Sequence, residues 1–132
     1  MTHAAGSFGF KDWAEEAFSA VAGGAKLARA SVTNLYHGDV EGEGTAQFLM
    51  IYGEGGSSSY TGLEQVTGTL GGRTGSFVLQ HAGTFDATSV TASWQVVPGS
   101  GAGDLRGLRG AGGFVAKHGQ PETPYTLEYR IE

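Results

Sequence analysis

Cysteine is absent from the 132 residues of this chain, and its absence excludes several kinds of site. Disulfide scaffolds, thiolate metal centres and cysteine nucleophiles all need the missing thiol. Charge is also scarce, at 16% of residues against roughly 25% in typical soluble domains. Acidic residues outnumber basic ones by 13 to 8, giving a net charge of -5, so we expect neither a nucleic acid nor an anionic membrane surface as a partner.

Long hydrophobic runs are missing too. No stretch of about 18 consecutive apolar residues occurs, and the longest apolar run, residues 48–52, has the length of a strand. The first residues have no basic segment followed by an apolar one, as a secretory signal would. The sequence therefore predicts a soluble, cytoplasmic protein with no membrane partner.

Motifs for cofactor and metal chemistry are also missing. The glycine-rich stretch 99–113 contains neither Gly-x-Gly-x-x-Gly nor a phosphate-binding loop ending in Gly-Lys, and no Gly-x-Ser-x-Gly occurs in the chain. The four histidines are too scattered for a zinc motif: His3, His37, His81 and His118. We therefore expect no cofactor and no metal.

Glycine, in contrast, is abundant, with 24 residues where roughly 7% is usual. Short runs rich in β-branched and aromatic residues recur about every dozen residues between turn-forming residues, which is typical of an antiparallel meander. Short connections are expected at 53–57, 70–73 and 86–88. The pattern predicts one domain, 1–132, with eight strands near 4–11, 26–38, 44–53, 58–70, 73–86, 89–97, 109–118 and 123–132.

Several of these strands contain internal glycines, such as Gly62, Gly68, Gly75 and Gly83. Glycine inside a strand usually marks a bulge, a sharp bend or a close approach of another group. A strongly coiled, closed sheet explains so many of them, and closure also removes the sheet edges. The predicted fold class is all-β, an eight-stranded antiparallel β-barrel.

Two segments depart from the meander. Residues 12–22 contain helix formers, a candidate N-cap at Asp12 with Glu15 three residues later, and a stop at Gly23. They predict a short helix or a lid-like loop. The stretch 98–113 is too rich in glycine for an ordinary strand, and one helical turn is expected near 104–108.

Five phrases carry a resemblance to a known family: LARASVT at 27–33, GDVEGEG at 38–44, GLEQVTG at 62–68, GSFVLQH at 75–81 and WQVVPGSG at 94–101. Across essentially the whole chain the sequence resembles a bacterial domain-of-unknown-function family. The resemblance implies a barrel similar to allene oxide cyclase, shared in outline with dirigent proteins and some polyketide cyclases. It implies no particular activity, because function depends on the site rather than the fold.

Glu64 is the best single catalytic candidate. Alternation in strand 58–70 places it on one face with Tyr60 and two glycines, and that face has the stronger claim to the interior. A carboxylate in an apolar lumen can serve as a general acid or base. The competing interpretation is structural: a buried carboxylate accepting hydrogen bonds from Arg29, Tyr36 or an amide fixes the register of the barrel.

The alternation in strand 73–86 leaves two choices open. If the face carrying Phe77 points inward, His81 joins the lumen as a second catalytic candidate; if it faces outward, Gln80 does. A lone histidine at such a place is more often structural than catalytic, although it titrates near neutral pH.

The leading functional hypothesis is a barrel that binds a small hydrophobic molecule, and isomerises or cyclises it without a cofactor. The alternatives are a non-catalytic carrier, comparable in architecture to lipocalins, and an interaction protein with a filled barrel. Apolar residues for both faces of the wall also predict a homodimer or homotrimer. The candidate ligand-binding residues are Arg29, Tyr36, Phe48, Tyr52, Tyr60, Gln80 and Trp94.

Overall fold

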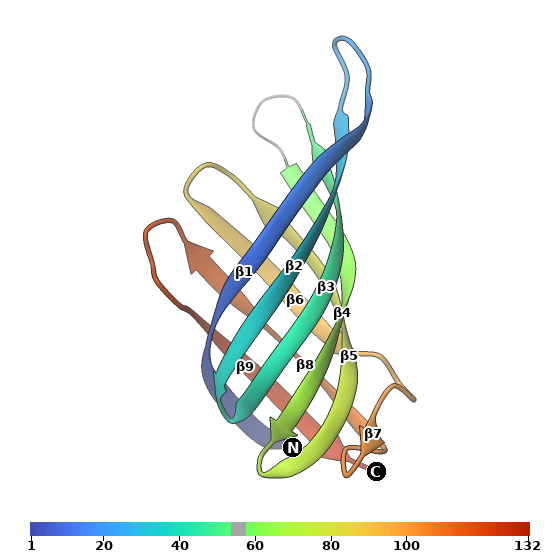
Figure 1. Cartoon of the computed structure of the whole chain (residues 1–132), viewed down its shortest axis with the longest axis vertical. Helices are drawn as coiled ribbons and strands as arrows, with labels where there is room; N and C mark the ends of the chain where they lie inside the picture. Colours follow the sequence, from blue (N-terminus) through green and yellow to red (C-terminus); the bar gives the residue numbers. More distant parts are fainter. Residues whose placement is uncertain (54–57) are drawn as a thin grey trace.

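The structure is a computed structural model that describes residues 1–53 and 58–132 (Figure 1). In the described residues all regular structure is β-strand, with no helix. The strands are β1 (Thr2–Ala20), β2 (Lys26–Gly38), β3 (Val40–Tyr52), β4 (Ser58–Leu70), β5 (Arg73–Phe85), β6 (Ser89–Val96), β7 (Ala102–Gly103), β8 (Leu108–Lys117) and β9 (Thr123–Ile131).

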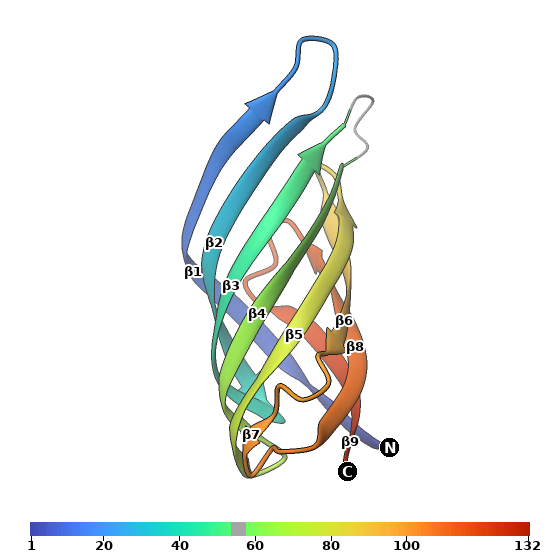
Figure 2. The same ribbon diagram turned by 90° about the vertical axis from the view of Figure 1, so that its right-hand side faces the viewer.

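Eight of these strands close into an antiparallel barrel. The hydrogen-bonded order is β4-β3-β2-β1-β9-β8-β6-β5, and β5 pairs back with β4. The first and last long strands, β1 and β9, are therefore neighbours, and both termini lie at the same end of the barrel (Figures 1 and 2). The two-residue strand β7 is an addition on β5 at that end. The predicted eight-stranded all-β barrel is confirmed.

The strand boundaries follow the glycine-containing turns that the sequence marks. The β4–β5 hairpin turns at Gly71 and Gly72, with φ of 58° and 84°, because a two-residue turn of this hand needs positive φ at both positions. The connection expected at 53–57 lies largely outside the described residues. Of the eight expected strands, seven agree with the structure to within a few residues.

The first strand is the exception, and the helix or lid expected over 12–22 is wrong. Residues up to Ala20 continue β1 and pair with β2 as far as Ala20 opposite Lys26. Register shifts after Lys11 and after Ala17 mark two bulges, and Asp12 adopts a φ of 59° at the first. Each bulge adds one residue and so moves the side chains that follow to the opposite face of the strand. The sequence of such a strand lacks a regular two-residue period and can therefore resemble that of a helix.

The glycine-rich connection after β6 contains turns rather than a helix. The amides of Leu105, Arg106 and Leu108 donate to carbonyls three residues earlier, at 3.1 to 3.4 Å. Leu105 is fully buried by this path and closes the end of the barrel near the termini. The helical turn expected near 104–108 is therefore replaced by successive hydrogen-bonded turns.

The interior has two parts along the barrel axis. The half near the termini is filled by a packed cluster that includes Phe8, Leu79, Trp94 and Leu127. The other half is walled by small and apolar side chains of β2 and β3, such as Ala28, Ala30 and Met50. No helix in the described part of the chain is long and apolar enough to cross a membrane.

The wall is incomplete in this second half. Strand β9 pairs with β1 only as far as Phe8 opposite Thr123, whereas β2 accompanies β1 to Ala20. The long β1–β2 hairpin, which remains paired with β3 on its other side, therefore extends past the shorter β8–β9 hairpin at the end of the barrel opposite the termini (Figure 1). The barrel is closed by packing at one end and accessible at the other.

Candidate functional site

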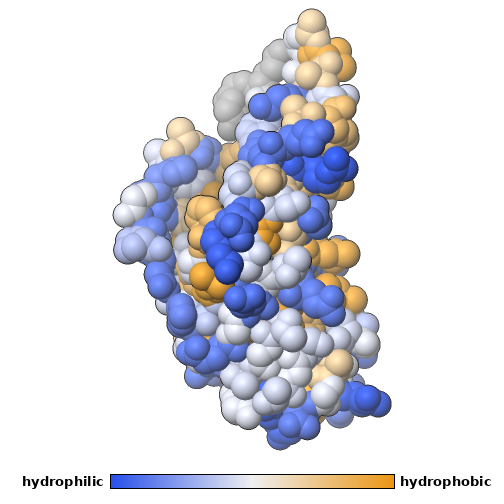
Figure 3. Space-filling view, in the orientation of Figure 1, coloured by the Kyte–Doolittle hydropathy of each residue, from blue (hydrophilic) through white to orange (hydrophobic). Residues whose placement is uncertain are grey.

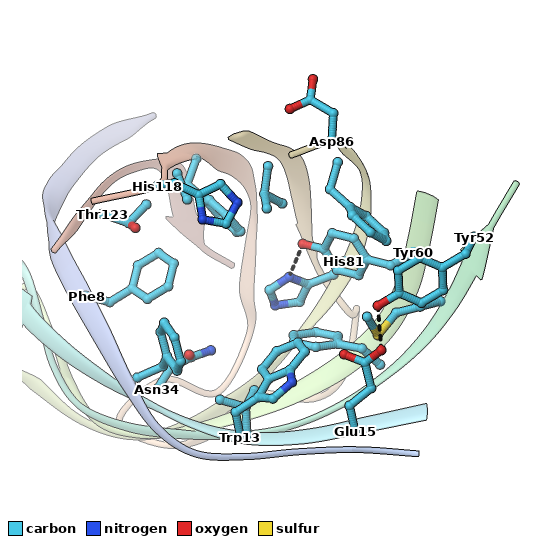
Figure 4. Close-up of a pocket in the computed structure, with 18 residues that line it drawn as sticks. Phe8, Trp13, Glu15, Asn34, Tyr52, Tyr60, His81, Asp86, His118 and Thr123 are labelled. Carbon is cyan, nitrogen blue, oxygen red and sulfur yellow. Dashed lines mark hydrogen bonds between the residues drawn. The ribbon is translucent and has the colours of Figure 1, made fainter. Parts of the chain in front are cut away.

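A cavity of about 290 Å³ occupies the accessible half of the barrel. Apolar surface is visible in the hollow between the long hairpin and the β8–β9 side of the molecule (Figure 3). Aromatic side chains make up much of the wall, and the few polar groups lie at the mouth and at the inner end (Figure 4). The lining residues are Phe8, Phe10, Trp13, Glu15, Val32, Asn34, Phe48, Met50, Tyr52, Tyr60, His81, Phe85, Asp86, Val90, Phe114, Ala116, His118 and Thr123.

Aromatic rings from five strands contact one another around this cavity. Phe48 of β3 packs edge-on against Tyr60 of β4 and against His81 of β5, with centroid separations of 5.0 and 4.9 Å. On the other side Phe8 meets Phe114 edge-on at 5.1 Å. These tilted and edge-on geometries fix ring orientations, so the wall is preformed rather than assembled by a ligand.

Glycines on the inner face make room for these rings. A Cβ on Gly83 would lie 2.7 Å from Cε1 of Tyr60, and one on Gly62 would lie 2.6 Å from Cδ1 of Phe48. Both glycines also sit close to backbone carbonyls of the neighbouring strand. The internal glycines therefore let the sheet coil tightly around large side chains.

The first bulge of β1 sets the mouth of the cavity. Phe10 faces inward opposite Asn34, and the extra residue at Asp12 brings Trp13 and then Glu15 to the same inner side. Phe10 and Trp13 contact each other with centroids 6.2 Å apart. Glu15 accepts a 2.5 Å hydrogen bond from the hydroxyl of Tyr52, which connects β1 to β3 across β2.

At the inner end of the cavity lies the fully buried carboxylate of Glu64. Its Oε2 accepts hydrogen bonds from the Tyr36 hydroxyl at 2.6 Å and from Asn34 Nδ2 at 3.0 Å. Its Oε1 lies 2.7 Å from Nε2 of His81. Gly44 clears the space, since a Cβ there would lie 1.9 Å from Oε2. Both carboxylate oxygens are thus occupied by protein groups.

The contacts of His81 define where its proton lies. Nδ1 is 3.2 Å from Nε1 of Trp94, an indole nitrogen that only donates, so Nδ1 must accept. The imidazole proton is therefore on Nε2 and is donated to Glu64. The Tyr60 hydroxyl is also within 3.3 Å of Nδ1 (Figure 4). In this arrangement every donor around Glu64 points toward the carboxylate.

Burial raises the pKa of the tyrosines near this network. Desolvation raises the pKa of Tyr36 well above its ordinary value of 10.0, and the charge of Glu64 adds to the effect. The same two causes raise the pKa of Tyr60. At the mouth, burial and the hydrogen bond to Glu15 raise the pKa of Tyr52 to about 12. All three phenols are neutral hydroxyls near neutral pH.

The structure divides the sequence-predicted site residues into three groups. Phe48, Tyr52, Tyr60 and His81 line the cavity. Glu64, Tyr36 and Trp94 are buried in the layer beneath it, where Tyr36 donates to Glu64 and His81 connects Glu64 to Trp94.

The third group consists of two wrong predictions, Gln80 and Arg29. Both side chains are exposed on the outside of the wall. Gln80 alternates with the buried Leu79 and His81, so the Phe77 face of β5 is the inner one. Arg29 lies between Ala28 and Ala30, which are fully buried, and so points to solvent.

The most important lining residues missed from the sequence are Asn34 and Trp13. Asn34 follows Val32 by two positions and precedes Tyr36 by two, so strand alternation alone places it inside. Trp13 could not be placed by strand alternation, because its inward direction depends on the extra residue at Asp12. Among the described residues no group of three His, Cys, Asp or Glu side chains forms a metal-binding cluster.

The fold and cavity define a closed β-barrel whose apolar lumen is open at one end. Residues 4–129 match the family DUF3224, described as a protein of unknown function, and the chain belongs to this family. It is similar to a crystal structure of a DUF3224 protein of unknown function from Shewanella oneidensis MR-1. That structure has 34% sequence identity and a TM-score of 0.86, with 100% of this chain and 98% of that chain covered. No protein with curated annotation matches the chain.

Proposed function

We propose that this protein binds a small, mainly apolar molecule in the lumen of its barrel. The observation that carries the proposal is the aromatic-lined cavity of about 290 Å³. Ligand pockets begin at roughly 300 Å³, and an apolar cavity of about 150 Å³ already holds benzene. A ligand with two fused rings, or a branched chain of similar bulk, is the matching size.

The packing of the barrel favours this proposal over a filled barrel that acts only as an interaction protein. The half near the termini is packed with side chains, including Leu105. The other half contains the cavity, although large aromatic residues surround it. A chain that needed only stability would fill this space, because empty apolar volume costs free energy.

A titration with 1-naphthol tests the proposal, with two tryptophan substitutions on β8 as matched variants. Ala116 lines the cavity, whereas Val115, its neighbour in sequence, is exposed on the outer face. We expect saturable binding with a negative heat-capacity change by calorimetry. Ala116→Trp should reduce the affinity at least tenfold and Val115→Trp should leave it unchanged. The absence of saturable binding, or equal loss in both variants, would refute lumen binding.

A cofactor-independent cyclase or isomerase is the second candidate. It is favoured by the position of the Tyr60 hydroxyl, which lies at the cavity wall and, because its pKa is raised, stays a neutral hydrogen-bond donor. The lumen would then hold the substrate in a reactive conformation while Tyr60 stabilises developing negative charge on oxygen. The barrel that the sequence resemblance implies, similar to allene oxide cyclase and dirigent proteins, supports this candidate only as an analogy of fold.

One contact favours simple binding over proton abstraction by His81. If Nδ1 took up a proton from Tyr60, its new N–H would face the N–H of Trp94 at 3.2 Å. Repulsion between the two donors opposes that state. A non-catalytic carrier is therefore the preferred function. Turnover by a cyclase or isomerase would be detected by chromatography as a product of unchanged mass but altered retention time. Tyr60→Phe should abolish such turnover while leaving ligand affinity within about threefold.

A further inference from the structure

Asn34 presents an unused hydrogen-bond acceptor to the lumen. Its side chain is 5% exposed and lines the cavity, pointing toward the centre of the barrel (Figure 4). Its Nδ2 donates to Oε2 of Glu64 at 3.0 Å. No hydrogen-bond donor among the described residues contacts Oδ1 of Asn34. Every described side-chain nitrogen or oxygen that is closed off from solvent has a hydrogen-bond partner. The unpartnered Oδ1 is therefore not closed off, and it faces the cavity.

The orientation of this amide is fixed by the network beneath it. The Trp94 N–H makes Nδ1 of His81 an acceptor, so Nε2 of His81 donates to Oε1 of Glu64. Tyr36 donates to Oε2 at 2.6 Å. A carboxylate that only accepts must also receive the NH₂ of Asn34, since turning the amide would place two oxygens against each other. Asn34 is therefore locked with its carbonyl toward the ligand.

We infer that the lumen selects a neutral, two-ring-sized apolar molecule that carries a hydroxyl or N–H donor, which Asn34 Oδ1 accepts. This inference rests on the proposed lumen binding and adds the chemistry of the ligand. A ligand oxygen without a proton could only accept a hydrogen bond, as Asn34 Oδ1 does. The two oxygens would not pair, and Oδ1 would stay without a donor in an apolar site. Sites built around a hydrogen bond reject analogues that lack the partner group.

The charges around the cavity further disfavour anions. The Glu64 carboxylate lies directly beneath Asn34, and Glu15 and Asp86 lie at the mouth. A ligand carboxylate at the inner end of the cavity would approach the buried Glu64 across an interior of low polarity, where repulsion between like charges is strong. Fatty acids and aryl carboxylates are therefore the wrong class, although their apolar parts would fit.

Three related probes test this selection on the wild-type protein: 1-naphthol, 1-methoxynaphthalene and 1-naphthoate. They share one ring system and differ in carrying a donor, only an acceptor, or a negative charge. We expect 1-naphthol to bind at least tenfold more tightly than either of the others. Equal or tighter binding of the ether or the carboxylate would overturn the inference but leave lumen binding intact. Failure of all three to bind would overturn both.

Two further measurements assign the selection to Asn34. The side-chain NH₂ resonances of Asn34 should shift with 1-naphthol and not with the ether. Asn34→Ala should bring the ratio of the two affinities close to one, whereas Tyr60→Phe, which alters the other hydroxyl near the cavity, should keep most of it. If the Asn34 signals do not move, or the ratio survives in Asn34→Ala, Asn34 is not the acceptor. The resonance measurement uses the wild type and so does not depend on the folding of a variant.

Discussion

At the scale of single residues, Glu64 decides between a structural and a catalytic interpretation. Its oxygens are both occupied, by Tyr36 and Asn34 on one and His81 on the other, and it does not line the cavity. The structural alternative raised from the sequence therefore describes Glu64 best. Its charge orients the polar groups that do reach the lumen. Burying these groups costs less free energy when every donor has an acceptor.

Glu64→Gln is expected to lower the free energy of unfolding by about 1–3 kcal/mol. The new NH₂ group would face at least one of the donors that now point at the carboxylate, leaving a buried mismatch. Chemical denaturation measures the change. Glu43→Gln, on the exposed face of β3, is the matched control and should change stability by less than about 0.5 kcal/mol. Equal stabilities of wild type and Glu64→Gln would contradict the network.

The buried phenols give the protein a specific response to high pH. Because the pKa values of Tyr36 and Tyr60 are raised in the folded state, the folded protein holds these protons more tightly than the unfolded chain. Their contribution to stability is complete below pH 10.0, the ordinary value, and is lost as the pH rises above it. We expect phenolate absorbance to appear together with cooperative unfolding. Ionisation of all five tyrosines in a protein that remains folded would contradict the burial of these two.

At the scale of strands, the sequence predicted regular elements well and the bulged one badly. Strand β4 alternates without interruption, so Glu64 could be placed inside from period alone. Strand β1 contains two bulges, and neither its length nor the inward direction of Trp13 follows from a fixed period. The lumen wall built by β1 was therefore missed. The contacts of His81 also lay beyond prediction, because they join β4, β5 and β6.

The bulge at Asp12 is expected to limit which residues position 12 accepts. Its φ of 59° is left-handed, a region open to Gly and tolerated by Asn or Asp but disfavoured for β-branched residues. Asp12→Val should lower stability by about 1–2 kcal/mol, whereas Asp12→Gly should be neutral within about 0.5 kcal/mol. Thermal unfolding of the two variants measures this difference. Equal melting temperatures would show that the bulge does not hold this conformation in solution.

At the scale of the whole molecule, the outer wall of β3 and β4 carries an apolar patch formed by Leu49, Ile51 and Leu63. Each is about half exposed, and Leu49 and Leu63 lie diagonally across the two strands. We propose that this patch packs against a second copy of the chain, as a homodimer or homotrimer, because monomers rarely leave neighbouring apolar side chains exposed.

Light scattering at micromolar concentration is expected to give a mass of two or three chains. The double variant Leu49→Ser and Leu63→Ser should reduce this mass to that of one chain. Val115→Ser, which changes a similarly exposed residue on β8, should not. A wild-type mass near 13.6 kDa would rule out this assembly while leaving the lumen proposal unaffected.

Native mass spectrometry of protein purified from the cells that naturally produce it shows directly whether the lumen holds a ligand. We expect a retained neutral molecule of low mass, carrying a hydroxyl or N–H group, on the wild type and on Val115→Trp. The same molecule should be absent from Ala116→Trp, in which the lumen is filled. Retention of the molecule by Ala116→Trp, or a wild-type protein that carries no added mass and binds none of the naphthalene probes, would contradict lumen binding.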